Sequence, residues 1–328
     1  MRMTRCVSVV SVIAPVQTPL RPPLQCRISV LIGGVIAAGT LVHEASGQST
    51  PFASAVVHYA AGSGAANGFT NPSAALGAPE RFTGEGLIPG CVTPFQPAFR
   101  PDEIVSIGAG GSLTVRFAQD VTDDPRNPFG IDLLVFGNAF FTDGGAGSGV
   151  VAGLAAEGGR ILVSADGLAW STVRGVDADG LFPTLGFLDV GPYATTPGRM
   201  PSDFLRPVDP AKSFSTLAGL DYAGLLAAYD GSGGGAGIDL AWVGLDAIRY
   251  VRIDGPIASG LSPEIDAFAD VAPVAPSADV DGDGTVGPAD LAALLAAWGS
   301  VDALLDLDGN GTVGSGDLAA VLSAWSGA

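Results

Sequence analysis

Two acidic segments near the C-terminus of this 328-residue chain repeat one pattern of oxygen-bearing side chains. Each segment places such side chains at positions 1, 3, 5 and 12 of a loop, with a glycine at position 6. The side chains are Asp279, Asp281, Asp283 and Asp290 in the first loop and Asp306, Asp308, Asn310 and Asp317 in the second. Calcium takes six to eight hard oxygen ligands, and a short loop can supply them only by wrapping around the ion. The spacing therefore predicts two calcium-binding loops.

The other loop positions suit the same chemistry. Gly284 and Gly311 permit the bend at position 6, which would strain a residue that has a Cβ atom. Thr285 and Thr312, one position later, would each offer a backbone carbonyl oxygen to the ion. A metal-free acidic turn is the alternative, but it would not require two copies in one register.

Each loop is followed by a short apolar stripe with helical spacing. The stripes are Leu291, Leu294, Leu295 and Trp298 after the first loop and Leu318, Val321, Leu322 and Trp325 after the second. Residues at i, i+3, i+4 and i+7 share one face of a helix, so we expect two helices that bury these faces against each other. The loop carboxylates repel one another without metal, so folding should be coupled to calcium binding.

These paired loops, with Asp rather than Glu at position 12 and no helix before either loop, resemble a type I dockerin module over residues 279–328. The resemblance implies two structural calcium ions and docking onto a cohesin-like partner. Pro288-Ala289 and Ser315-Gly316 stand where cohesin-binding dockerins usually carry polar or hydroxyl residues. Another surface receptor for this tail therefore remains an open alternative.

The N-terminus has the pattern of a signal peptide over residues 1–47. Arg27 precedes 15 uncharged residues, 28–42, and Ala45-Ser46-Gly47 would form a cleavage site before Gln48. The apolar run is short for a membrane-spanning helix, so we expect a secreted or cell-surface protein with no membrane span after cleavage. The unusual leading residues leave the true start codon open.

Composition sets further bounds on the function. The formal net charge is −18, and Lys212 is the only lysine, so no basic patch for nucleic acid is expected. Abundant glycine (48) and proline (24) with only 15% charged residues favours many turns and short strands. Cys91 is the only cysteine outside residues 1–47, so no internal disulfide can form in the mature chain.

Residues 48–270 are predicted to form a mainly β domain, an antiparallel jelly-roll-like β-sandwich, with residues 271–278 as a proline-stiffened linker. Apolar and polar residues alternate in several short runs, and Asp166-Gly167 suits a tight hairpin turn. The expected strands are Ala55–Ala60, Glu103–Ile107, Ser112–Phe117, Ile131–Phe136, Arg160–Ala165, Ala247–Ile253 and Ile265–Val271. One helical stretch is expected over Leu217–Tyr229.

This domain resembles, more loosely, the discoidin-like or galactose-binding modules of bacterial surface proteins. The segments that carry the likeness are Ala74–Pro79, Val163–Trp170, Arg249–Ile253 and Glu264–Phe268. The resemblance implies a carbohydrate- or surface-binding module without catalysis, with a further calcium ion in the sandwich as one possibility.

A polysaccharide-active hydrolase of O-glycosyl bonds, brought to a scaffold by the same tail, is the alternative function, and a structural surface protein is the second. Candidate catalytic carboxylates are identified by residue type only: Asp123, Asp124, Asp132, Asp143, Glu157 and Asp239. Four aromatic residues could stack on sugar rings or belong to the core: Trp170, Tyr193, Tyr229 and Trp242. We favour the non-catalytic binding protein.

Overall fold

The computed structural model of the protein describes residues 50–256, 260–273, 276–281 and 285–326. Antiparallel strands dominate, which confirms the prediction of a mainly β protein with few helices. The expected signal peptide lies outside the described residues. Within these ranges, no helix combines the length and apolar character needed to cross a membrane.

The larger sheet has the strand order β1-β5-β12-β9-β10, with every neighbouring pair antiparallel. Its strands are β1 (Ala55–Ala60), β5 (Ser112–Thr122), β9 (Gly158–Ser164), β10 (Ser171–Asp179) and β12 (Ala247–Asp254). Side chains alternate across a strand, so Leu113, Val115 and Phe117 of β5 are buried while Arg116 between them is exposed.

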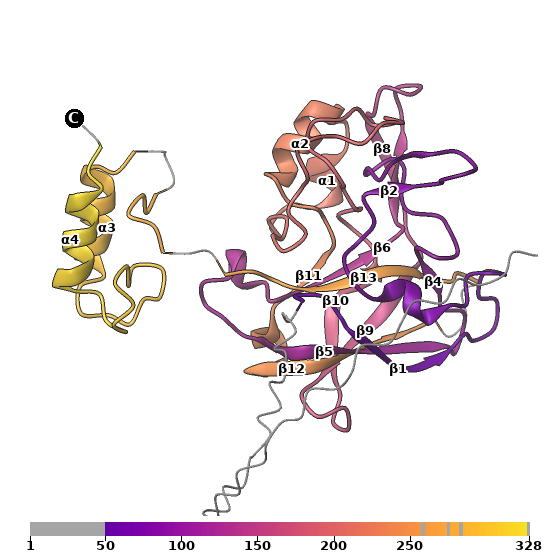
Figure 1. Ribbon diagram of the computed structural model, residues 1–328, viewed down its shortest axis with the longest axis horizontal. Helices are drawn as coiled ribbons and strands as arrows, with labels where there is room; N and C mark the ends of the chain where they lie inside the picture. The colour runs from indigo at the N-terminus through magenta and orange to yellow at the C-terminus, as the bar shows by residue number, and fades with distance from the viewer. Residues whose placement is uncertain (1–49, 257–259, 274–275, 282–284, 327–328) are drawn as a thin grey trace, which may run out of the picture. The chain divides into compact units, whose positions relative to one another are not determined.

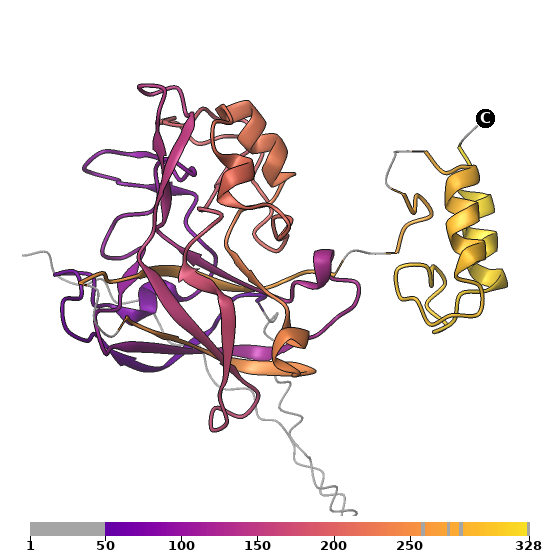
Figure 2. The same cartoon turned by 180° about the vertical axis from the view of Figure 1, so that it is seen from behind.

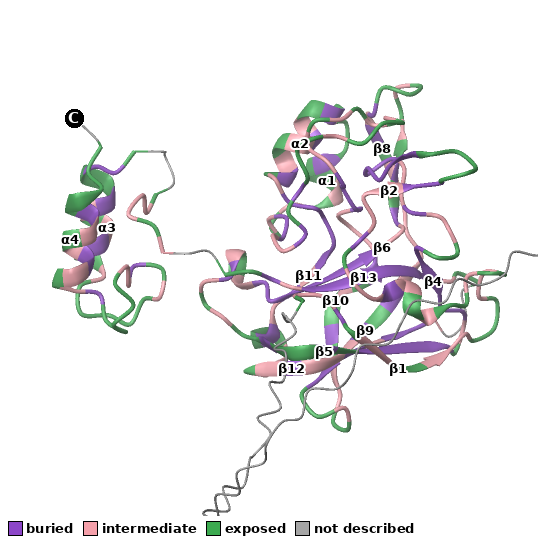
Figure 3. Ribbon diagram, viewed as in Figure 1, coloured by how far each residue is buried: buried purple, intermediate pink, exposed green. Residues whose placement is uncertain are grey.

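The second sheet has the order β11-β6-β13-β4 and is also antiparallel. Its strands are β4 (Val105–Ser106), β6 (Leu133–Gly137), β11 (Ala236–Ile238) and β13 (Glu264–Asp270). Strand β6 is covered on both faces: Leu133 and Val135 join the core shared with the larger sheet, and Leu134 and Phe136 join a cluster on the opposite face. Figure 3 shows β6 and β13 buried along most of their length.

A cap of short elements and irregular connections covers that opposite face. It contains β2 (Phe82–Thr83), β3 (Gly90–Cys91), β7 (Phe140–Asp143), β8 (Val151–Ala155), α1 (Phe214–Leu217) and α2 (Tyr222–Tyr229). The 3-10 helices η1 (Pro72–Ala75), η2 (Pro128–Gly130) and η3 (Leu240–Val243) lie in other connections. Figures 1 and 2 show the four-stranded sheet between the five-stranded sheet and the cap, whose apolar cluster includes Phe141, Leu225 and Tyr229.

Several predicted elements have different ends in the structure. The single helix expected over Leu217–Tyr229 is wrong, because α1 ends at Leu217 and Asp221 caps a separate α2 by accepting a hydrogen bond from the Gly224 amide at 2.8 Å. The strand expected over Glu103–Ile107 is reduced to β4. The hairpin between β9 and β10 is confirmed, but the tight Asp166-Gly167 turn is wrong, because residues 165–170 connect the two strands and only Gly167 of the pair has a positive φ (75°).

The C-terminal tail contains two helices, α3 (Pro288–Ala296) and α4 (Ser315–Ser323). Leu294 and Val321 are fully buried and pack in one cluster with Val286, Leu305 and Val313. The expected burial of both complete stripes is wrong, since four of their members stay 38–54% exposed: Leu295, Trp298, Leu322 and Trp325. Trp298 lies beyond the end of α3, and a pair of helices can cover only one narrow face of each partner.

Candidate metal centres and ligand cavity

The first tail loop brings three of its predicted ligands together. One carboxylate oxygen from each of Asp279, Asp281 and Asp290 lies within 4.8 Å of the others. Asp290, in the first turn of α3, is held by the backbone amides of Val280 (2.6 Å), Asp281 (3.2 Å) and Gly287 (2.7 Å). Of the other predicted ligands, Thr285 is in the described part of the loop, and Asp283 lies outside it.

The second loop repeats this arrangement with Asp306, Asp308 and Asp317, whose carboxylate oxygens also approach within 4.8 Å. Asp317 accepts hydrogen bonds from the amides of Asp308 (3.1 Å) and Gly314 (2.6 Å). Asn310 does not add a carboxylate, but its Oδ1 atom accepts a hydrogen bond from the Thr312 amide at 3.0 Å. Asn310 and Thr312 therefore belong to the turn that surrounds the three carboxylates.

The geometry of this loop also explains a glycine at position 11. A Cβ atom on Gly316 would lie 1.7 Å from Oδ2 of Asp308. The absence of a side chain at position 316 therefore lets Asp308 reach the cluster. This requirement applies to the second loop alone, because the first loop has Ala289 at position 11.

The carboxylate at position 12 of each loop is held in its ionised form by the backbone. Backbone hydrogen bonds, first that from Gly287, hold the pKa of Asp290 below its ordinary value. Burial opposes ionisation of Asp317, but amide hydrogen bonds outweigh it and lower the pKa of Asp317 as well. Residues 279–328 contain eight acidic residues and no lysine, arginine or histidine. Clustered carboxylates without a basic residue in the same segment are a donor set that suits calcium.

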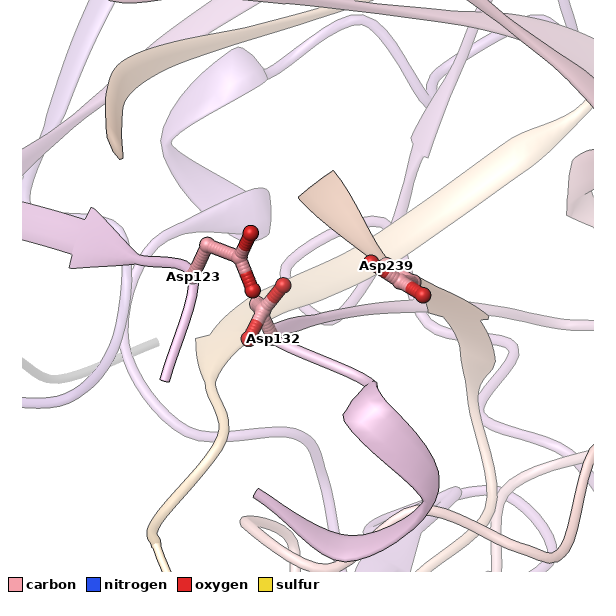
Figure 4. Close-up of side chains that lie close together, drawn as sticks. All are labelled: Asp123, Asp132 and Asp239. Carbon is pink, nitrogen blue, oxygen red and sulfur yellow. The ribbon is translucent and has the colours of Figure 1, made fainter. Parts of the chain in front are cut away.

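Three of the carboxylates considered for catalysis, Asp123, Asp132 and Asp239, also lie together, with oxygens within 4.8 Å (Figure 4). Burial raises the pKa of Asp132, against three hydrogen bonds that lower it. The carboxylates of Asp124 and Asp143 do not belong to this cluster and have other partners. Asp124 forms an ion pair with Arg126 at 2.7 Å, and Asp143 accepts hydrogen bonds from four backbone amides of its own turn.

Glu157 contributes to a different feature, a cavity of about 760 Å³. Charged and aromatic side chains line it together: Glu157, Asp179, Arg174, Lys212, Phe182 and Trp242. Trp242 is 50% exposed, so its ring is accessible to a ligand. A cavity with an aromatic surface and a few polar groups is the usual form of a small-molecule site.

The carboxylates of Glu157, Asp179 and Glu264 form a group at this cavity, with oxygens within 4.8 Å. Asp179 is fully buried and accepts a hydrogen bond from the Ala139 amide at 2.6 Å. Burial, and then its hydrogen bond with Glu157, raises the pKa of Asp179 well above its ordinary value. The raised pKa favours the protonated form of Asp179, which can donate a hydrogen bond to the Glu157 carboxylate. Sequence reasoning missed Asp179 and Glu264, because only the fold brings them to Glu157.

The remaining residues singled out in the sequence have structural roles. Tyr229 is fully buried, and its hydroxyl donates to the Pro183 carbonyl at 2.9 Å, so it belongs to the core. Tyr193 donates to Asp143 at 3.1 Å. Cys91 is buried, which raises the pKa of its thiol, and Sγ lies 3.1 Å from the Thr196 carbonyl.

No protein-family model matches the chain, and no curated protein matches it. The carboxylate clusters and the cavity therefore carry the functional argument.

Proposed function

We propose that this chain is a secreted, non-catalytic binding protein, in which a carbohydrate- or surface-binding β-sandwich is carried by a calcium-dependent, dockerin-like tail. The observation that carries the proposal is the pair of three-carboxylate clusters in a module without any basic residue. The same loop positions, 1, 3 and 12, converge in both copies. Two calcium ions would remove the repulsion within each cluster.

The small size of the tail supports the coupling of its folding to calcium. Its buried apolar cluster consists of only five residues, with others packed around it. A core of this size seldom stabilises a module of about 50 residues, and small modules usually depend on metals or disulfides. Calcium bound only by the folded loops would therefore supply a large share of the stability of the tail.

The exposed aromatic residues of the tail support docking to a partner. Leu295 and Leu322 are 51% and 54% exposed, and Trp298 and Trp325 are 49% and 38% exposed. Each member of these pairs lies 27 positions from its counterpart, so both repeats present the same apolar residue types to solvent. Exposed tryptophan and leucine residues commonly form protein-binding surfaces. A cohesin-like or another surface receptor is the partner that this tail would bind.

The cavity of the sandwich supports a carbohydrate ligand. Sugar rings stack on exposed aromatic faces, and sugar hydroxyls pair with carboxyl groups that both donate and accept hydrogen bonds. Trp242 offers such a face, and the raised pKa of Asp179 favours a protonated carboxyl group that can donate while its neighbour Glu157 accepts.

The same carboxyl pair is the observation that favours the alternative, a glycoside hydrolase. Hydrolases place two carboxyl groups about 5–10 Å apart on either side of the scissile bond. Glu157 and Asp179 are instead joined by a hydrogen bond, which leaves no room between them for a glycosidic bond. Their geometry therefore favours ligand binding over hydrolysis.

Calorimetry of the full-length protein tests the role of the tail. We expect a chelator to remove one unfolding transition from the wild-type protein, and the double variant Asp290→Asn/Asp317→Asn to lack that transition even in calcium. Asp302→Asn is the matched control, since Asp302 is exposed in the same tail and belongs to neither cluster. Identical melting curves with and without chelator would refute calcium-coupled folding.

A glycan array and an assay of reducing-sugar release distinguish the functions of the sandwich. Binding that is lost in Trp242→Ala but kept in Trp170→Ala supports the proposal. Sugar release that disappears in Glu157→Gln would establish the hydrolase instead. If the protein neither binds a glycan nor releases sugar, the remaining function is that of a structural surface protein.

A further inference from the structure

Three aspartates from three separate segments meet where the two large sheets of the sandwich come together. Asp123 directly follows β5 of the five-stranded sheet. Asp132 directly precedes β6, and Asp239 directly follows β11, in the four-stranded sheet. Because Ile238 of β11 pairs with Leu133 of β6, the adjacent Asp132 and Asp239 are brought side by side. Figure 4 shows the carboxyl groups of Asp123 and Asp132 turned toward each other, with Asp239 beside them.

Two of the three carboxylates are fixed in place by hydrogen bonds. Asp132 is fully buried, and its Oδ1 atom accepts from the Asp124 amide at 3.2 Å, while its Oδ2 atom accepts from the Leu240 amide at 2.9 Å. Asp239 caps η3 through Oδ1, which accepts from the Ala241 amide at 2.7 Å. The carboxylate of Asp123 has no hydrogen bond within the described residues and is free to complete a coordination shell.

A buried oxygen without a hydrogen bond points independently to a missing ligand. Asn127 is only 5% exposed, and its Nδ2 atom donates to Oδ1 of Asp132 at 2.8 Å. The Oδ1 atom of Asn127, bonded to the same carbon as that nitrogen, has no partner within the described part of the chain. Buried side-chain oxygens are almost always paired, and leaving one unpaired destabilises the folded state. Rotation of the amide by half a turn would bring this oxygen to face Asp132 across a bound cation.

The surrounding charges leave the cluster without a basic partner. Arg126 is the basic side chain of this loop, and it is engaged by Asp124 through Nε at 3.0 Å and Nη2 at 2.7 Å. Among the described ion pairs, none involves Asp123, Asp132 or Asp239. Three carboxylates and an amide oxygen form a set of hard oxygen donors without histidine or cysteine. This set suits calcium, which tolerates irregular coordination, better than zinc or copper.

We propose that Asp123, Asp132, Asp239 and Oδ1 of Asn127 bind one calcium ion that ties the end of β5 to β6 and β11. The ion would join the two sheets at a point where only loops connect them. It would also fix the start of η3, which contains Trp242 of the cavity. This site is separate from both tail loops, and the proposal does not depend on the function of the tail.

Equilibrium dialysis of the full-length protein against labelled calcium tests the proposal by stoichiometry. In the tail-disabled variant Asp290→Asn/Asp317→Asn, we expect one ion per chain to remain bound. Adding Asp123→Asn should weaken this binding roughly tenfold or more, because an anionic ligand is lost. Asp102→Asn is the matched control, since its side chain is 80% exposed and it lies outside the cluster.

The outcomes separate this site from the tail. No calcium bound to the tail-disabled protein would overturn the proposed site, as would one ion whose affinity is unchanged by both Asp123→Asn and Asp239→Asn. One ion bound by both the wild-type and the tail-disabled protein would instead refute the calcium loops of the tail and leave this site standing. Circular dichroism of each variant establishes that it is folded. Asp123 is exposed and its side chain makes no hydrogen bond in the described region, so this side chain can be replaced without disturbing the core.

Discussion

Replacing Glu80 with glutamine should stabilise the sandwich at neutral and alkaline pH but not in acid. Burial and the nearby charges of Glu103, Glu85 and Asp102 raise the pKa of Glu80 from 4.5 to about 7. The neighbouring Arg81 does not compensate, because its guanidinium lies over the Phe204 ring at 3.9 Å and donates to Gly186 and Ser202. The folded protein therefore holds a proton on Glu80 that the unfolded chain has already lost.

The sign and size of the effect follow from this shift. Below the unfolded pKa of 4.5, Glu80 is protonated in both states and costs nothing. As the pH rises toward 7, the unfolded state binds fewer protons than the folded state, so stability falls until Glu80 ionises in both. A shift of this size corresponds to about 3 kcal/mol at most, and partial exposure of Glu80 reduces it to about 1–2 kcal/mol. Glutamine carries no charge, so Glu80→Gln removes this cost.

Urea unfolding followed by circular dichroism, in calcium, measures the difference. We expect Glu80→Gln to raise the free energy of unfolding by about 1–2 kcal/mol near pH 8 and to leave it almost unchanged near pH 4. The control Glu85→Gln, at an exposed neighbour, should give a smaller gain. A gain of equal size at both pH values would refute the reasoning, since it could not come from the ionisation of Glu80.

Two further predictions concern the tail. Gly316→Ala would push Oδ2 of Asp308 out of the second cluster, so calorimetric titration should show one of two tail ions bound roughly tenfold more weakly, with the other unchanged. Val321→Ala removes two methyl groups from a fully buried site and should cost about 2–3 kcal/mol, seen as a lower melting temperature of the calcium-loaded tail. Leu322→Ala, at a position 54% exposed, should change stability by less than about 0.5 kcal/mol; an equal cost for both variants would contradict the observed packing.

The sequence predicts those strands whose burial pattern is set by their own residues. Strands β5 and β12 alternate apolar and polar side chains; both were expected at their observed starts, but β5 continues to Thr122, five residues beyond the predicted end. Strand β10 was not expected, because Gly175 and Asp177 disfavour strands and its pairing with β9 shifts register between Thr172 and Asp177. Its stability comes from a neighbouring strand, and a local pattern does not contain that information.

The same distinction applies to the candidate sites. The tail loops can be predicted because all their ligands fall within twelve consecutive residues, whose spacing reflects coordination directly. Asp123 and Asp239 are separated by 116 positions, and only the pairing of β11 with β6 and the packing of the two sheets unite them. Their residue type alone suggested catalysis as readily as metal binding. The buried amide of Asn127 gave no recognisable pattern in the sequence.

The excess of acidic residues explains why these clusters need different kinds of neutralisation. The chain has 33 acidic and 15 basic residues, so acidic residues outnumber lysine and arginine by 18. Some lie singly in turns. Hydrogen bonds from the amides of Gly149, Gly145 and Val150 and from the Tyr193 hydroxyl lower the pKa of Asp143 to about 2, and amide hydrogen bonds likewise lower the pKa of Asp189. Others face each other, and their repulsion can be relieved only by a proton or by a metal cation.

The direction of each pKa shift indicates which of the two is used. Asp179 has a raised pKa, so a proton on this carboxyl group can relieve the repulsion from Glu157 without metal. Asp290 and Asp317 have lowered pKa values, so protonation cannot relieve repulsion in the tail until the solution is strongly acidic. A chelator at neutral pH should therefore unfold the tail, whereas the Glu157–Asp179 pair should need no cation. Ligand binding by the cavity of Asp123→Asn, which lacks the proposed sandwich ion, should be unchanged by chelator, and its loss would show that the cavity carboxylates also depend on a cation.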